Sequence, residues 1–219
     1  PRTPGFHLGN RGSTPLGDAY LERHLVNEES RPTTIIDKKL QLHKFCSNCG
    51  SSVSIKIPSG DNRLRAVCDK CGIIFYENPK IVAGCLLSWK NKILLCKRAT
   101  EPRSGYWTLP AGFMENHETV EEGARRETME EAGAKSDKIQ LFLMCNLPHI
   151  SQVYMMYYGK LTDGIYEAGI ESSEVRLFNK DEIPWQDIAF TVIEKTIKLY
   201  YEDVEKGNID IHFDTIIKK

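Results

Sequence analysis

Apolar residues in the second half of the chain occur in short runs separated by polar turns. Such runs, rich in β-branched and aromatic residues and bounded by Gly, Asn, Asp or Pro, are typical of β-strands. The runs that predict strands are IVAGCLLSW from Ile81, ILLCKR from Ile93, IQLFLMC from Ile139, SQVYMMYYGKL from Ser151, and Glu174–Phe178. The third and fourth runs are expected to pair with each other.

Two other segments repeat their apolar residues with the period of a helix. The first is predicted over Val120–Ala132, because Thr119 and Glu122 form a capping-box pattern and Gly133 suits the position after a helix. The second is an amphipathic helix predicted over Ile188–Glu205. Strands interspersed with helices favour an α+β sandwich, in which helices cover a mixed sheet.

The glutamates of the first predicted helix are placed unusually. The apolar stripe passes through Ala124 and Thr128, and Glu127 and Glu131 fall inside or beside that stripe, with Glu130 next to them. A solvated helix carries its charges on the opposite face. Carboxylates at the edge of a buried face are costly unless they are paired or bind a cation. This spacing therefore suits magnesium-assisted phosphate chemistry.

A second interpretation of the same helix stays open. Arg126 lies four residues from both Glu122 and Glu130, so it reaches either carboxylate on one helix face. The segment is then a charged surface helix that is held together by Glu–Arg pairs.

Four cysteines before the strands form two pairs. Cys46 and Cys49 are separated from Cys68 and Cys71 by 18 residues, a C-x2-C-x18-C-x2-C pattern that predicts a tetrahedral zinc ribbon. Between the pairs, apolar and polar residues alternate as in the strands of a β-hairpin, with a turn near Pro58. So short a module buries little core, which favours a structural zinc ion over a docking role for the ribbon.

Composition limits the remaining classes of protein. The chain has 219 residues, 41% hydrophobic and 27% charged, as in soluble globular proteins. Its formal charge of −1 argues against nucleic acid as a partner. No apolar run approaches the ~20 residues of a membrane span. Paired cysteines favour a metal site in a reducing compartment. The other three cysteines, Cys85, Cys96 and Cys145, lie in apolar runs and are expected to be packing residues.

Four segments are expected: an irregular N-terminal arm over 1–44, the zinc ribbon over 45–78, the main domain over 79–206 and a C-terminal tail over 207–219. The arm is rich in Gly and Pro and poor in apolar residues. A first residue other than Met suggests that a targeting peptide was removed. We expect the arm to contact a protein partner, either a second copy in a homodimer or a larger organellar assembly.

The segment Gly112–Ala134 resembles the Nudix box, Gly-x5-Glu-x7-Arg-Glu-U-x-Glu-Glu-x-Gly-U, where U is aliphatic. The matching positions are Gly112, Glu118, Arg126, Glu127, Thr128, Glu130, Glu131, Gly133 and Ala134. Two residues depart from the pattern. Thr128 replaces a bulky aliphatic residue, and His117 stands where many members carry Gly. The resemblance implies the Nudix α/β/α sandwich and the cleavage of a diphosphate linked to another group, X.

The resemblance also implies a divalent metal site, for Mg²⁺ or Mn²⁺. The implied ligands are the carbonyl oxygen of Ala111 and the carboxylates of Glu127, Glu130, Glu131 and Glu174. Glu127 is alternatively the base that deprotonates the attacking water, and Glu171 is the second choice for the late carboxylate given to Glu174.

Other residues receive supporting roles. Arg126 is implied to orient the glutamates, and Glu118 to steady the junction between loop and helix. Lys97 and Arg98 end a predicted strand near the box and are candidates to bind the diphosphate. Trp107 is a candidate to stack on a substrate ring, although aromatic residues at such positions are often structural.

Within the family, residues 45–216 resemble the plant-organelle type of FAD pyrophosphohydrolase. NADH pyrophosphatases carry a Ser-Gln-Pro-Trp-Pro-Phe-Pro-x-Ser motif after the box, whereas this chain has Leu147-Pro148-His149-Ile150-Ser151-Gln152. We therefore expect hydrolysis of FAD to FMN and AMP, or of ADP-ribose, ahead of NADH.

Two alternative functions remain. The first is a non-catalytic or moonlighting accessory subunit of a larger organellar, mitochondrial complex, suggested by the arm and the two departures from the box. The second is an RNA 5′-end pyrophosphohydrolase, against which the near-neutral charge argues. We expect a soluble protein of an organelle matrix, with the mitochondrion favoured over the plastid, or otherwise of the cytoplasm.

Overall fold

The structure, a computed structural model, describes residues 44–217, so the predicted arm lies outside the described residues but for Lys44. The chain divides into two compact units between Tyr76 and Glu77. Each unit has its own sheet, and the two units are described separately below.

The first unit is a three-stranded antiparallel sheet in the order β1-β2-β3. Its strands are β1 Val53–Lys56, β2 Arg65–Cys68 and β3 Ile74–Phe75. The turn between β1 and β2 is closed by the Asp61 amide, which donates to the Pro58 carbonyl over 3.1 Å. The hairpin predicted between the two cysteine pairs is therefore confirmed.

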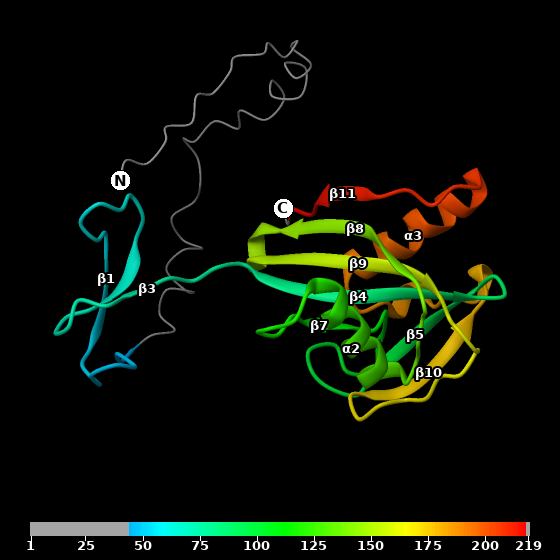
Figure 1. Cartoon of the computed structure of the whole chain (residues 1–219), viewed down its shortest axis with the longest axis horizontal. Coiled ribbons are helices and arrows are strands. Elements are labelled where there is room, and N and C mark those ends of the chain that lie inside the picture. The colour runs from blue at the N-terminus through cyan, green and yellow to red at the C-terminus, as the bar shows by residue number, and fades with distance from the viewer. Residues whose placement is uncertain (1–43, 218–219) are drawn as a thin grey trace, which may run out of the picture. The chain divides into compact units, whose positions relative to one another are not determined.

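The second unit contains an eight-stranded mixed sheet (Figure 1). Its strands are β4 Lys80–Trp89, β5 Lys92–Arg98, β6 Trp107–Thr108, β7 Ala111–Phe113, β8 Ile139–Leu147, β9 Gln152–Lys160, β10 Ser172–Phe178 and β11 His212–Thr215. The main order is β10-β5-β4-β9-β8-β11, with β6 paired to β5 and β7 paired to β4. The predicted pairing of the third and fourth runs is confirmed, since β8 and β9 are antiparallel neighbours.

The two long helices cover opposite faces of this sheet (Figure 1). They are α2 Val120–Ala132 and α3 Thr191–Lys206. Alternate side chains of β4 point to opposite faces. Cys85 and Leu87 pack with the α2 side, whereas Leu86 packs with the α3 side. The expected α/β/α sandwich with a mixed sheet is therefore confirmed. Neither helix combines the length and the apolar character that crossing a membrane requires.

The start of α3 differs from the prediction. The predicted helix began at Ile188, whereas α3 begins at Thr191. Ile188 instead forms a parallel bridge with Trp107, and the Ala189 amide donates to the Trp107 carbonyl over 2.8 Å. This tertiary pairing holds the segment extended, with short 3₁₀ turns before it at Lys180–Glu182 and Trp185–Asp187.

The C-terminal segment expected as a tail belongs to the main sheet. After Gly207 ends α3 in the left-handed conformation, β11 pairs in parallel with β8. Asp203, fully buried on α3, accepts hydrogen bonds from the Asp210 amide at 2.9 Å and lies 2.8 Å from the His212 ring. These contacts attach the last strand to the helix layer.

Candidate active site

Local capping determines where α2 begins and ends. Its first turn carries the predicted capping box, in which the Glu122 amide donates to the Thr119 hydroxyl and the Thr119 amide donates to the Glu122 carboxylate. Gly133 ends the helix with φ 55°, and its amide donates to the Met129 carbonyl. The predicted bounds, Val120–Ala132, are those of the structure.

The loop before α2 contains a strained residue. His117 has φ 71°, in the left-handed region that glycine adopts without steric cost. This is one of the two positions at which the sequence departs from the box pattern. The next residue, Glu118, compensates by accepting the Glu115 amide over 2.7 Å, and this bond fixes the loop against the helix.

Arg126 connects the acidic residues of the site. Its guanidinium donates to both carboxylate oxygens of Glu118, at 3.0 and 2.8 Å. It also donates to Glu127 at 2.8 Å and to Glu130 at 3.0 Å. Hydrogen bonds from Arg126 hold the pKa of Glu118 down, at about 2. Arg126 therefore joins the carboxylates of Glu118, Glu127 and Glu130 in a single hydrogen-bond network. Such a network holds the glutamate side chains in fixed orientations.

Glu127 lies where a side chain on the neighbouring strand would collide with it. A Cβ added to Gly112 would stand 2.3 Å from the Glu127 carboxylate carbon. The absence of a side chain at Gly112 therefore makes room for this carboxylate. Burial raises the pKa of Glu127, the Arg126 hydrogen bond opposes that rise, and the negative charge of Glu130 adds to it.

Glu131 is the most deeply buried of these carboxylates, with 5% of its surface exposed. The Ala111 amide donates to it over 3.0 Å, which places β7 directly against the helix. Burial raises the pKa of Glu131 to about 7, and the charge of Glu127 contributes to the rise. The Ala111 hydrogen bond and the charge of Arg98 oppose it.

The three glutamates together have the chemistry of a divalent-metal site. Glu130 extends into solvent with 58% of its side chain exposed, while Glu127 and Glu131 lie at the buried edge. Their oxygens are hard ligands of the kind that Mg²⁺ prefers. Arg126 pairs with Glu118 as well as with Glu127 and Glu130, so its one positive charge is shared among three carboxylates. The cluster therefore retains negative charge that a divalent ion would neutralise.

The two candidates for a late carboxylate, Glu174 and Glu171, have different surroundings. Glu174 lies opposite Lys97 in the sheet, and its carboxylate stands 3.9 Å from the Lys97 ammonium. The negative charge of Glu171, by contrast, raises the pKa of both Glu127 and Glu131. An irregularity in the pairing of β10 with β5, between Ser172 and Glu174, separates the two residues.

The three residues predicted to contact substrate, Lys97, Arg98 and Trp107, lie in different surroundings. Arg98 acts on Glu131 through its charge and donates to the Pro102 carbonyl over 2.8 Å. Lys97 lies over the ring of Trp107 at 5.7 Å. Trp107 is 6% exposed and belongs to the core between the sheet and α3. The structure therefore corrects the stacking role suggested for Trp107, because its ring is enclosed by protein.

Phe113 is an exposed aromatic residue that the sequence reasoning missed. The residue is 48% exposed, and the Lys80 ammonium lies 4.9 Å from the ring centroid. Its carbonyl accepts from Arg126 over 3.1 Å, which places it beside the acidic network. The signal in the sequence is an aromatic residue directly after the first glycine of the box.

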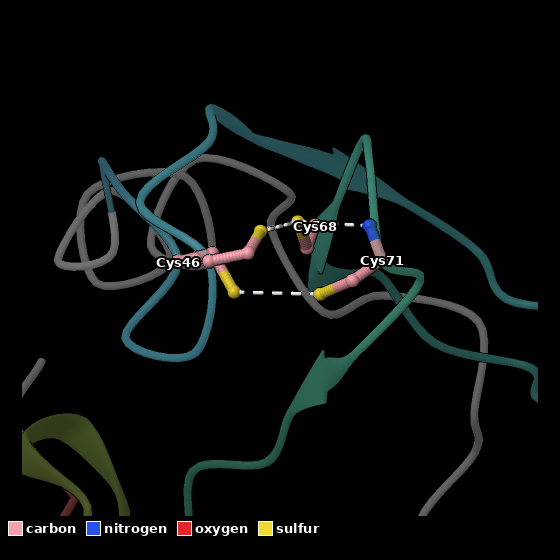
Figure 2. Close-up of side chains that lie close together, drawn as sticks. Cys46, Cys68 and Cys71 are labelled. Carbon is pink, nitrogen blue, oxygen red and sulfur yellow. Dashed lines mark hydrogen bonds between the residues drawn. The ribbon is translucent and has the colours of Figure 1, made fainter.

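In the first unit, the four predicted zinc ligands converge. The sulfurs of Cys46, Cys49, Cys68 and Cys71 all lie within 4.8 Å of one another. Cys46 and Cys71 are 3.6 Å apart, and Cys49 and Cys68 are 3.5 Å apart; Figure 2 shows Cys46, Cys68 and Cys71 close together. Zn–S bonds of about 2.3 Å in a tetrahedron imply sulfur separations of about 3.8 Å, so the cluster fits zinc.

The surroundings of Cys68 favour the thiolate form of its side chain. The Cys71 amide donates to its sulfur over 3.4 Å, and this bond lowers the pKa of Cys68 to about 6. Because a metal ligand must be the thiolate, a lowered pKa reduces the cost of deprotonation.

The metal-free protein is expected to lose stability as the pH rises from 5 to 8. The pKa of Glu131 is raised from 4.5 to about 7, so the folded state binds more protons than the unfolded state in this window. The shift corresponds to up to about 3 kcal/mol of the free energy of unfolding, present below pH 5 and lost above pH 7.

Urea unfolding without metal, at several pH values, measures this loss. Glu131→Gln is the matched variant, because a neutral amide mimics the protonated acid and removes its titration. Equal pH slopes for the wild type and Glu131→Gln would contradict the prediction.

Family models match both units. A model for the Nudix N-terminal zinc ribbon matches residues 44–77, and the NUDIX domain model matches residues 78–200. A solved NUDIX hydrolase from Nitrosomonas europaea is 53% identical, covers 80% of this chain and all of its own, and superposes with a TM-score of 0.77.

Curated relatives carry functional names. An ADP-ribose pyrophosphatase from Methanocaldococcus jannaschii is 33% identical over 132 residues, which are 57% of this chain and 75% of the relative. The NAD-capped RNA hydrolase NudC from Chromobacterium violaceum is 25% identical over 158 residues, or 71% of this chain. The chain spans 57% of the length of that second relative.

Proposed function

The chain belongs to the NUDIX family, and we propose that it is a divalent-metal-dependent pyrophosphohydrolase that cleaves ADP-ribose or a similar dinucleotide. One observation carries the proposal most strongly. Glu127, Glu130 and Glu131 share one flank of α2, and Arg126 contacts two of them while Ala111 contacts the third. Every charged position of the family box is present in this arrangement.

The residues divide the work of hydrolysis. Glu130, Glu131 and Glu171 would hold a divalent ion, with Glu127 as a further ligand or as the base. The ion would offset charge on the diphosphate and lower the pKa of the attacking water. Arg98 contributes positive charge next to Glu131, where a substrate phosphate would carry negative charge. The water oxygen attacks phosphorus, the bridging P–O bond breaks, and the leaving phosphate takes the electron pair.

Glu127 is the candidate for the proton acceptor. Its raised pKa makes it a better base than an ordinary exposed carboxylate, and Arg126 fixes its position. Glu131 is less suited, because it is the most deeply buried of these carboxylates, with 5% of its surface exposed. The exposed ring of Phe113 is a candidate to contact a ring of the substrate.

The two candidate substrates, ADP-ribose and FAD, are supported by different observations. The relative named an ADP-ribose pyrophosphatase supports ADP-ribose as the first substrate to test. FAD stays a prediction, which rests on the resemblance to FAD pyrophosphohydrolases and on the segment Leu147–Gln152 that replaces the NADH motif. Both substrates present an ADP group, so the same metal site would serve either.

A substrate panel tests the choice of X. Purified protein with Mg²⁺ is incubated with equal concentrations of ADP-ribose, FAD and NADH, and the products are separated by chromatography. We expect the highest kcat/KM with ADP-ribose or FAD, giving AMP with ribose 5-phosphate or FMN. A preference for NADH would contradict this assignment while retaining the reaction class.

NAD-capped RNA is the second candidate substrate, because a relative with that name aligns with 71% of the chain. The formal charge of −1 supplies no overall attraction to an RNA backbone. Release of 5′-monophosphate RNA from capped transcripts, faster than AMP release from ADP-ribose, would favour this function.

The remaining proposals concern the setting of the protein. An accessory role in an organellar complex, a partner bound through residues 1–44 and a matrix location rest on the sequence of the arm, on the two departures from the box and on the resemblance to an organellar enzyme. Co-purification from native extract with and without residues 1–44 tests the complex and the partner. Loss of a large species on truncation supports the partner, and an unchanged small species argues against it.

A further inference from the structure

The loop between β9 and β10 crosses the last turn of α2. The Glu167 amide donates to the Ala132 carbonyl over 2.8 Å, and the Gly169 amide donates to the Glu131 carbonyl over 3.1 Å. Carbonyls in the last turn of a helix have no partner within the helix. The loop therefore supplies the missing donors at the end of α2 that carries Glu130 and Glu131.

Gly169 approaches the helix too closely for any other residue. A Cβ added there would lie 1.7 Å from the carbonyl oxygen of Glu130 and 2.8 Å from its carbonyl carbon. That neighbour is helix backbone, which cannot rotate away as a flexible side chain would. A side chain at position 169 must therefore displace the loop from the helix.

The segment after Gly169 is fixed on its other side. The Ser172 amide donates to the Gly169 carbonyl over 3.1 Å, and the Ala99 amide donates to the Glu171 carbonyl over 2.8 Å. Glu171 is thus held between α2 and the end of β5 by main-chain hydrogen bonds. Glu171 follows Gly169 by two residues, so the main-chain bonds that dock the loop on the last turn of α2 also keep Glu171 at the end of the helix that carries Glu130 and Glu131.

We propose that Gly169 is a positioning residue for the metal site, because its contact with the α2 backbone holds Glu171 against the helix glutamates. Loop and ion then stabilise each other: the docked loop completes the ligand set, and the bound ion keeps the loop docked. The inference rests on the metal binding in the proposed function but on no particular substrate.

Mn²⁺ binding measures this directly, by electron paramagnetic resonance of the free ion, without substrate. The comparison includes the wild type, Gly169→Ala, Glu171→Gln and the double variant. We expect each single change to weaken Mn²⁺ binding about tenfold, as losses of supporting contacts do. The double variant is expected to be no weaker than Glu171→Gln alone, because both changes remove the same ligand.

Ile170→Ala is the matched control, since this side chain lies between the two residues and is 100% exposed. It should bind Mn²⁺ like the wild type. A folded Gly169→Ala protein with wild-type Mn²⁺ affinity, additive losses in the double variant, or wild-type affinity of Glu171→Gln would each overturn the proposal.

Hydrogen exchange of the wild type keeps the proposal testable if Gly169→Ala does not fold. Mn²⁺ should slow exchange of the amides of Glu167 and Gly169, and Glu171→Gln should remove that slowing. Unchanged exchange in the wild type at saturating Mn²⁺ would overturn the proposal. Because neither readout uses turnover, an inactive protein that shows these metal effects would refute the proposed function and leave this inference standing.

Discussion

Replacing Glu130 by Gln is expected to lower kcat by about 10²–10³-fold while leaving the fold intact. A bound ion stabilises a phosphoryl transition state by several kcal/mol, and each 1.4 kcal/mol corresponds to a factor of ten in rate. Gln has nearly the same shape but lacks the negative charge that binds the ion.

Glu130 is well suited to this test because it contributes little to stability. Its side chain is 58% exposed, and Arg126, with which it is paired, keeps its hydrogen bonds to Glu118 and Glu127. The thermal midpoint should therefore shift by no more than about 2 °C, as for other exposed substitutions. The measurement is kcat with ADP-ribose across a Mg²⁺ titration.

Glu121→Gln is the matched control for this experiment. Glu121 lies on the same helix and pairs with Arg125 at 2.9 Å, outside the Arg126 network. It should retain the wild-type rate. If both variants lose activity equally, the loss reflects the helix and not the metal face.

Removal of zinc is expected to unfold the sheet β1-β2-β3. Modules below about 40 residues, such as the ribbon predicted over 45–78, rarely fold without a metal or disulfide, and structural zinc contributes about 10–16 kcal/mol in small zinc domains. The described sheet β1-β2-β3 has no disulfide, and its cysteines are free thiols gathered around the predicted ion position. Cys49→Ser and chelation should therefore produce the same loss of structure.

Hydrogen exchange measured by mass spectrometry follows each unit separately. Peptides from β1 and β2 should exchange within the dead time in Cys49→Ser, whereas peptides from α2 and β4 should keep their protection. Ser47→Ala, a change at an exposed position between Cys46 and Cys49, is the control and should behave like the wild type. Slow exchange of β1 and β2 after complete zinc removal would contradict a structural role for the ion.

Elements with strong local signals were predictable from the sequence. The bounds of α2 were correct because Thr119 and Gly133 mark its ends by hydrogen bonds within a few residues. The four cysteines converge because two short turns and one hairpin are enough to bring them together. In both cases, the interactions that define the structure lie close together in the sequence.

Features that depend on distant contacts were not predictable in the same way. The choice between Glu171 and Glu174 depends on where the β9–β10 loop meets α2 and on an irregular strand pairing. The strand β11 forms because β8 offers an open edge, a partner remote in the sequence. The sequence shows Trp107 only as an aromatic residue near the box, and its burial in the core follows from contacts with residues distant in the sequence.

The most direct test of the account compares AMP release by the wild type and by Glu130→Gln, with ADP-ribose and FAD in excess Mg²⁺. The account predicts AMP from at least one substrate with the wild type, and release slower by about 10²-fold or more with Glu130→Gln. Equal rates for the two proteins, or no AMP from either substrate with the metal-loaded wild type, would contradict the central claim that the α2 glutamates bind the ion that promotes hydrolysis.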